Sequence, residues 1–387
     1  MALKDLWNTS RAECEARTIQ QIISWAGSLR DGSTAATDFR EYLDLIPASL
    51  LSRYCNQCLD SPFQDSGLAL QDLINHVGKR LGFDVEFGRY RGTQNSIGFD
   101  GIWKFPSGHS AVIEVKTTSA YQLRLETIAK YRLSLIEQTK LLEDHSSILI
   151  VVGRDDTTDL EAQIRGSRYA WDMRLISIDA LLRLLSVKED LENPSIVSQI
   201  QDILIPREFT KLDDVIEFLF STASDLRPEV EPEESVVESS SDGPEAEASE
   251  VATFQRRSLE KLEKKLNVTL LKQTRSSFSS TDGATVVVCK ASREYVKASR
   301  ITGYWFGFYE FQMDMITNVP NGFAAFQCGN PDKVLLIPAK ELHAWSAQMN
   351  RTETKRNAYW HVHINSEFLL IRKAGAPPVE LRRFLVP

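Results

Sequence analysis

Apolar residues recur along the chain with two different periods, which predict helices in some stretches and strands in others. Residues 1–60 repeat apolar positions at helical spacing, which predicts a small helical cap. The same period continues through residues 68–83 (LALQDLINHVGKRLGF), where it predicts one amphipathic helix. Residues 111–117 and 147–153 are rich in β-branched and apolar side chains and predict strands. The second of these strands carries no charge and should be buried on both faces.

The charged residues of the middle region lie on either side of a predicted turn at residues 105–109. Asp100 ends a short apolar run that is predicted to be a strand before this turn, and the run after it contains Glu114 and Lys116. Because side chains in a strand alternate between faces, Glu114 and Lys116 should project to the same side. With the right register, the resulting β-hairpin brings Asp100 beside Glu114.

This arrangement indicates a particular chemistry. Two carboxylates held close together repel each other unless a cation neutralises them, and carboxylate oxygens suit Mg²⁺ or Mn²⁺. Asp100 and Glu114 are therefore candidate metal ligands. Lys116 would orient or activate a water molecule, or stabilise a phosphoryl transition state, in metal-assisted phosphodiester hydrolysis. The alternative is that Glu114 and Lys116 form only a solvated ion pair.

Asp100, followed fourteen residues later by Glu114-Val115-Lys116, resembles the motif of the PD-(D/E)XK nucleases, which include restriction endonucleases and Holliday-junction resolvases. The order of predicted elements over residues 65–185 is also similar to that family. The resemblance implies an α/β restriction endonuclease-like core, with helices flanking a mixed sheet. It further implies a Mg²⁺-dependent DNA endonuclease, with Mn²⁺ able to substitute, in which Asp100 and Glu114 bind the metal and Lys116 is catalytic.

Two positions depart from the pattern of the family. Its upstream helix commonly contributes a Glu, and the matching position here holds Gln71, with Asp72 beside it. Gln71 is therefore a further candidate for the catalytic site, and its amide leaves open whether a second metal binds. Phe99 stands where the motif has its Pro.

Candidate substrate contacts follow the strand at 147–153. In several branches of the superfamily, a Gln and a Tyr on the next helix, with nearby basic groups, reach the substrate backbone. The resemblance implies this role for Gln163, Arg165 and Arg168, whose side chains suit phosphate oxygens. The alternative is that the two arginines pair with acidic residues at the surface.

The net charge of −8 conceals a strong polarisation along the chain. Residues 224–250 contain ten Asp and Glu against one Arg, whereas residues 251–387 contain 20 Lys and Arg against 11 Asp and Glu. The acidic stretch is too polar to bury the surface that would offset the entropy of ordering. We therefore expect a nuclease-like core with closing helices at 61–223, a disordered linker at 224–252, and a separate basic α+β domain at 253–387. The linker is either a spacer or a competitor of DNA for the basic domain.

The basic domain contains candidate DNA contacts, because basic groups bind phosphates and exposed aromatic rings stack on bases. These candidates are Arg293, Lys297, Arg300, Tyr304 and Trp305. Residues 304–311 include six aromatic side chains, which cannot all be exposed, so most of them should be core. His361 and His363 share one face of a predicted strand, which permits either a metal pair or a structural role.

The remaining features concern the setting of the protein. No run approaches about 18 uninterrupted apolar residues, and the N-terminal residues lack a signal-peptide core, so we expect a cytoplasmic protein without a membrane partner. Five scattered cysteines argue against a disulfide framework. Because double-strand cleavage needs two active sites, we expect a homodimer acting on DNA in restriction or antiviral defence. The alternative is a sensor that binds nucleic acid or a nucleotide signal through a core with weak or no nuclease activity.

Overall fold

The computed structural model divides the chain into two units, Met1–Pro228 and Glu229–Pro387. The residues it describes are 2–90, 97–117, 123–153, 157–191, 201–206, 212, 216, 256–292, 294–296, 302–353, 358–373 and 376–387. The linker expected at 224–252 lies outside these residues. Among the residues described, no helix combines the length and the apolar character needed to cross a membrane.

The first unit begins with five helices. Their bounds are α1 Leu3–Thr9, α2 Arg11–Ala16, α3 Ile19–Ala26, α4 Thr34–Leu45 and α5 Ala48–Asp60. Hydroxyl groups cap two of them: Thr18 accepts a hydrogen bond from the Gln21 N–H at the start of α3, and Ser33 accepts one from the Ala36 N–H at the start of α4. The helices bury their apolar sides in the same hydrophobic core as the sheet that follows.

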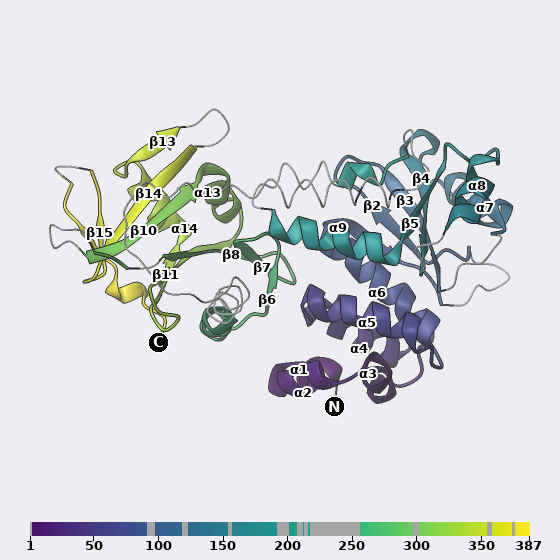
Figure 1. Ribbon diagram of the computed structural model, residues 1–387, viewed down its shortest axis with the longest axis horizontal. Coiled ribbons are helices and arrows are strands. Elements are labelled where there is room, and N and C mark those ends of the chain that lie inside the picture. The colour runs from purple at the N-terminus through teal and green to yellow at the C-terminus, as the bar shows by residue number, and fades with distance from the viewer. Residues whose placement is uncertain are drawn as a thin grey trace, which may run out of the picture. The chain divides into compact units, whose positions relative to one another are not determined.

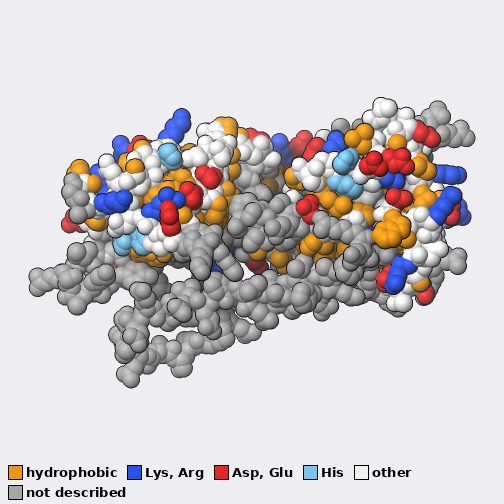
Figure 2. All heavy atoms as spheres, turned by 90° about the horizontal axis from the view of Figure 1, so that it is seen from above, with side chains coloured by type: hydrophobic (Ala, Val, Ile, Leu, Met, Phe, Trp, Pro, Cys, Tyr) orange, Lys and Arg blue, Asp and Glu red, His pale blue; other side chains and the backbone are white. Residues whose placement is uncertain are grey.

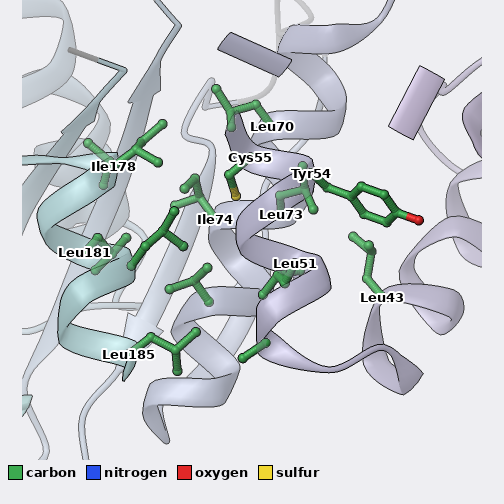
Figure 3. Close-up of a cluster of buried hydrophobic side chains, with 14 of the residues drawn as sticks. Leu43, Leu51, Tyr54, Cys55, Leu70, Leu73, Ile74, Ile178, Leu181 and Leu185 are labelled. Atoms are coloured by element: carbon green, nitrogen blue, oxygen red, sulfur yellow. The ribbon is translucent and has the colours of Figure 1, made fainter. Parts of the chain in front are cut away.

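Helix α6, Ser66–Leu81, lies at the centre of the first unit and confirms the helix predicted at 68–83. Its side chains meet those of α4, α5 and the later helix α9, Ile178–Asp190, in one core (Figure 3). The helix ends because Gly82 adopts the left-handed conformation, at a φ of 96°. Since α6 is covered on most sides, most of its polar residues are buried as well.

A five-stranded mixed sheet completes the first unit. Its strands, in spatial order, are β1 Asp84–Phe87, β2 Gly101–Lys104, β3 Ser110–Lys116, β4 Ser146–Val152 and β5 Met173–Ser177. The pairs β1–β2 and β2–β3 are antiparallel, whereas β3–β4 and β4–β5 are parallel. Helices α6 and α9 cover one face, and α7 (Leu125–Glu137) and α8 (Thr158–Arg165) cover the other (Figure 1). The first unit therefore has the α/β core, with a mixed sheet between helices, that the sequence predicts.

Strands β2 and β3 form the predicted hairpin around the turn at residues 105–109. Asp100 lies directly before β2, so the expectation that it ends a strand is wrong. The strand that leads into the turn begins only at Gly101, which pairs with Ile113 of β3. Although Asp100 lies one residue before β2, it is still held beside β3, because the Asp100 N–H donates to the Ile113 carbonyl at 3.0 Å.

The second unit combines two sheets with helices in an α+β arrangement (Figure 1). Its strands are β6 Leu270–Lys272, β7 Ser277–Ser280, β8 Thr285–Ser292, β9 Tyr295–Val296, β10 Thr302–Tyr309, β11 Asn321–Cys328, β12 Val334–Pro338, β13 Arg351–Glu353, β14 Ala358–Asn365, β15 Leu369–Ile371 and β16 Val379–Glu380. One sheet has the order β16-β15-β14-β10-β9, with β13 also on β14, and the other has the order β12-β11-β8-β7-β6. Helices α13 (Glu310–Thr317) and α14 (Ala339–Ser346) share a core with both sheets. A second core lies under the helical residues 256–266.

Candidate functional site

The backbone of Asp100 is fixed by groups from several elements. Its N–H is bound to Ile113, as described above. Its carbonyl oxygen accepts three hydrogen bonds, from the Gly88 N–H (3.0 Å), Gln71 Nε2 (3.1 Å) and Asn75 Nδ2 (2.9 Å). Helix α6 and the residues after β1 therefore hold this main chain in one position, which gives the Asp100 side chain a preorganised place.

The carboxylate of Asp100 reaches β3 between Glu114 and Lys116. Its Oδ2 accepts a hydrogen bond from the Val115 N–H at 2.7 Å. Burial, followed by the nearby Glu114 carboxylate, raises the pKa of Asp100 to about 7, whereas the Val115 N–H and the Lys116 ammonium act in the opposite direction. Because an ordinary aspartic acid has a pKa of about 3.9, the ionised form is disfavoured here.

Glu114 and Lys116 project to one face of β3, and Lys116 Nζ donates to Glu114 Oε1. The Glu114 side chain is 8% exposed, and its other oxygen, Oε2, is buried without a hydrogen-bond partner among the described residues. Burial acts to lower the pKa of Lys116, but the attraction and hydrogen bond of Glu114 outweigh it and raise the pKa. A solvated surface pair does not fit a carboxylate this buried.

Tyr131 of α7 lies near this site, although no pattern in the sequence indicated it. Its hydroxyl would lie 3.3 Å from a Cβ built on Gly98. Burial and the carboxylates of Glu114 and Asp100 raise the pKa of Tyr131, and Lys116 lowers it, so the hydroxyl is within electrostatic reach of all three groups. Helical periodicity could not identify it, because a Tyr at this spacing is equally typical of a core position.

The two carboxylates suit one divalent cation. No cluster of three or more His, Cys, Asp and Glu side chains that could hold a metal ion is present in the described part of the chain. Mg²⁺ is usually bound through one or two carboxylates and keeps several of its waters. The buried Glu114 Oε2 without a partner, next to an Asp100 carboxyl whose charge is disfavoured, fits this mode of binding.

Helix α6 contributes to the site through amides. Gln71, expected among the catalytic groups, donates from Nε2 to the Asp100 carbonyl and so positions the backbone of Asp100. Asp72 beside it is bound elsewhere, by Arg40 Nε at 3.0 Å and by the Tyr90 hydroxyl. At these two positions the helix therefore offers the site an amide and no carboxylate.

The candidate substrate contacts around α8 differ in their surroundings. Gln163 is engaged with the Leu123 backbone, since Oε1 accepts from the Leu123 N–H (2.9 Å) and Nε2 donates to its carbonyl (2.6 Å). Its expected contact with DNA is therefore withdrawn, and it anchors the chain between β3 and α7. Arg165 is exposed and pairs with Glu161 at 3.5 Å, as in the surface alternative. Arg168 is also exposed and donates only to the neighbouring tyrosine hydroxyl among the hydrogen bonds of the described residues.

The DNA-binding candidates of the second unit fall into three groups. Arg293, Lys297 and Arg300 lie outside the described residues. Tyr304 is 4% exposed and belongs to the core between the sheets, so it is withdrawn as a DNA contact. Trp305, the next residue of β10, points to the opposite face and is half-buried there.

No family model matches the sequence, and no curated protein matches it. Among solved structures, the chain is similar to the restriction endonuclease PspGI in a complex with its substrate DNA. The match covers 58% of this chain and 94% of that chain, with 11% sequence identity and a TM-score of 0.25. A likeness of this size carries no weight for function, so the proposal below rests on the geometry of the site.

Proposed function

We propose that this chain is a metal-dependent endonuclease that hydrolyses phosphodiester bonds in DNA. The observation that carries the proposal is the buried Glu114 Oε2, without a hydrogen-bond partner, beside the Asp100 carboxyl with a pKa of about 7. Buried carboxylates in this state are costly unless a cation neutralises them. Strongly perturbed carboxyl groups of this kind are concentrated at functional sites.

The roles of the residues follow from their environments. Asp100 and Glu114 would hold Mg²⁺, for which Mn²⁺ can substitute. A bound cation supplies a water of lowered pKa and neutralises charge on the phosphate. Lys116 keeps its proton because Glu114 raises its pKa, so Nζ orients a water or neutralises the phosphate and is not a resting base. The Tyr131 hydroxyl interacts electrostatically with these three groups.

DNA as the substrate is supported by the charge of residues 251–387, which make up most of the second unit. Residues 251–387 contain 20 Lys and Arg against 11 Asp and Glu, and such a surface gains affinity for DNA by releasing its counterions. On the visible face, Lys and Arg side chains stand among hydrophobic and acidic ones (Figure 2). We assign target binding mainly to this unit and cleavage to the first. Cleavage of both strands would require two copies, which sedimentation of the purified protein checks.

Plasmid cleavage tests the proposed function. Supercoiled plasmid, methylated or unmethylated, should be nicked or linearised in Mg²⁺ or Mn²⁺ and left intact in EDTA. Glu114→Gln keeps the shape of the side chain but removes its charge, so it should lower the rate roughly 100-fold or more. The matched control is Glu86→Gln, an exposed carboxylate on β1 that lies 3.9 Å from Lys104 Nζ, and it should cleave like the wild type. Full activity of Glu114→Gln, or cleavage in EDTA, would contradict the proposal.

A preference between the methylated and the unmethylated plasmid would support a role in restriction or antiviral defence.

A binding protein without cleavage is the second candidate. Gln71 favours this candidate, because an amide stands at the position where a carboxylate could bind a second metal. The Gln71 amide donates a hydrogen bond to the Asp100 carbonyl instead. In that case the wild type would bind DNA or a nucleotide and leave the plasmid intact in every metal.

A further inference from the structure

The outer face of the sheet at β10 and β14 carries a group of aromatic rings that we call the aromatic face. Its members are Trp305, Tyr309, Tyr359, His361 and His363. The strands pair antiparallel, with Trp305 opposite His363 and Tyr309 opposite Tyr359, so these side chains project to the same side. The alternate residues of both strands fill the core, whereas every ring of the aromatic face is half-buried or exposed.

The rings of the aromatic face contact one another in a series. The centroids of Tyr309 and Tyr359 are 5.5 Å apart, those of Tyr359 and His361 are 5.2 Å apart, and those of His361 and His363 are 6.2 Å apart. Trp305 stands nearly edge-on to Tyr359 and His361, at 6.5 and 5.6 Å. Tyr359, His361 and His363 are stacked on one another, at interplanar angles of 27° and 13°. The series therefore forms a row of rings across two strands.

His361 is fixed within this series by both of its nitrogens. The Trp305 Nε1–H donates to His361 Nδ1 at 3.2 Å, so Nδ1 is an acceptor. His361 Nε2 lies 2.7 Å from the Thr352 hydroxyl of β13 and is left to donate to it. This chain of hydrogen bonds holds three side chains of the sheet surface in one geometry before any ligand arrives, which lowers the entropy lost on binding.

Gly307 keeps the centre of the aromatic face open. It lies opposite His361, and a Cβ at this position would stand 3.5 Å from both the Trp305 and the Tyr359 rings. A Gly inside a strand weakens the strand and often marks the close approach of a ligand. The position between the rings therefore fits the approach of a flat group to the sheet.

We propose that the aromatic face binds single-stranded DNA by stacking unpaired bases on its rings. Stacking uses the π face that every base has, and such sites combine aromatic side chains with positive charge. Residues 251–387 complement a phosphate backbone because they carry 20 Lys and Arg against 11 Asp and Glu. At the border of the face, the Lys290 ammonium lies 5.3 Å from the Tyr309 ring centroid.

The same geometry favours a single strand over a duplex. In a duplex the faces of the bases are covered by their neighbours, and sequence is read at base edges by an element that enters a groove. The aromatic face is a sheet surface that offers rings and no inserted helix. This inference rests on the proposed function only for the choice of DNA as the nucleic acid, because the proposed cleavage requires no stacking.

Fluorescence anisotropy of the full chain with a labelled oligo(dT), in EDTA, tests the aromatic face separately from cleavage. Trp305→Ala and Tyr359→Ala should each weaken binding of the single strand about tenfold or more and leave binding of a duplex nearly unchanged. His363→Ala removes an exposed ring at the end of the series, so it should fold normally and weaken binding several-fold. Trp25→Ala is the matched control, since Trp25 is an exposed Trp of the first unit, and it should bind like the wild type.

Three results would contradict the assignment of the aromatic face to single-stranded DNA. Wild-type affinity of folded His363→Ala and Tyr359→Ala would remove the aromatic face as a binding site, and equal loss on duplex and single strand would remove its selectivity. A clear preference for an RNA of the same sequence would make RNA the ligand instead. Glu114→Gln should bind oligo(dT) like the wild type, so loss of cleavage and loss of stacking are distinguishable.

Discussion

Asn75 shows how a single buried side chain can organise the candidate active site. It is fully buried on α6, where Nδ2 donates to the Asp100 carbonyl at 2.9 Å and Oδ1 accepts from Trp103 Nε1 at 3.0 Å. Both ends of the amide are therefore used, one for the site and one for the core. The residue acts through the backbone of Asp100, so it is a positioning residue and touches no reacting atom.

We expect Asn75→Ala to destabilise the fold by about 1–3 kcal/mol, because the Trp103 indole N–H would lose its buried partner. Urea unfolding measures this change. The matched control is Asn8→Ala, at an exposed position of α1, which should change stability by less than about 0.5 kcal/mol. An Asn75→Ala variant as stable as the wild type would mean that the hydrogen bond from the Trp103 indole does not contribute to stability.

His109 should make stability depend on pH. Burial, followed by repulsion from His145 and Arg132, lowers the pKa of His109 to about 4, and Asp202 acts in the opposite direction. Between about pH 6.5 and 4 the unfolded chain binds a proton at this residue that the folded chain does not. The free energy of unfolding is therefore unaffected by the titration of His109 above pH 6.5, and it decreases as the pH falls from 6.5 toward 4.

The expected loss from His109 is about 1–2 kcal/mol, reduced from the full effect because the side chain is only partly buried. Thermal unfolding from pH 7 to pH 4 measures it, and His109→Gln should flatten the profile. The exposed His343→Gln should leave the profile as in the wild type. An unchanged slope in His109→Gln would place the pH dependence elsewhere.

At the scale of elements, two glycines of α6 have opposite roles. A Cβ on Gly78 would collide with the ring of Trp103, whereas a Cβ on Gly67 would meet only Thr117 Cγ2, at 3.8 Å. The contact at Gly78 lets β2 pack closely on the helix, and it keeps the Trp103 indole in reach of Asn75.

Alanine substitution at these two glycines should therefore change stability in opposite directions. Gly78→Ala should cost about 1–3 kcal/mol because it overpacks the core. Gly67→Ala should stabilise by up to about 1 kcal/mol through helix propensity. Both variants can be compared by urea unfolding, and similar effects of the two would show that close packing on Trp103 is not what Gly78 provides.

The elements were predictable where one local pattern decides them. Helical period and a terminal Gly indicated α6, and the alternation in β3 indicated that Glu114 and Lys116 share a face. What depends on packing between elements could not be read from the sequence. Tyr304 and Trp305 were both candidate DNA contacts, and only packing against the second sheet decides that Tyr304 is the buried one.

Residues whose role depends on tertiary contacts could not be identified from the sequence, because these contacts are set by packing between elements. Gln163 is a donor of the expected type, yet its amide meets the Leu123 backbone, 40 positions earlier. Tyr131 interacts electrostatically with the carboxylates because α7 packs on the sheet face that carries Glu114. No pattern within either helix separates these outcomes from a plain surface or core position.

At the scale of the whole molecule, charge is divided between the acidic stretch 224–250 and the basic residues 251–387. At physiological ionic strength the Debye length is about 8 Å, so an acidic stretch that serves as a spacer should not compete with DNA. Replacing its ten Asp and Glu by Asn and Gln should then change the dissociation constant for DNA by less than about twofold at 0.15 M salt. Tenfold tighter binding of the neutralised chain, measured by anisotropy, would identify the stretch as a competitor.

The most direct test of the account separates cleavage from binding at Lys116. Single-turnover cleavage of a labelled duplex in Mg²⁺ and its anisotropy in EDTA are measured for the wild type, Lys116→Met and Lys104→Met. Lys104 is the matched control because it is an exposed lysine on the neighbouring strand β2, paired with Asp84 and Glu86. If Lys116 acts on the water or the phosphate, Lys116→Met should lose roughly 100-fold or more of the cleavage rate, while both variants bind DNA like the wild type. Cleavage by Lys116→Met at the wild-type rate would contradict the account.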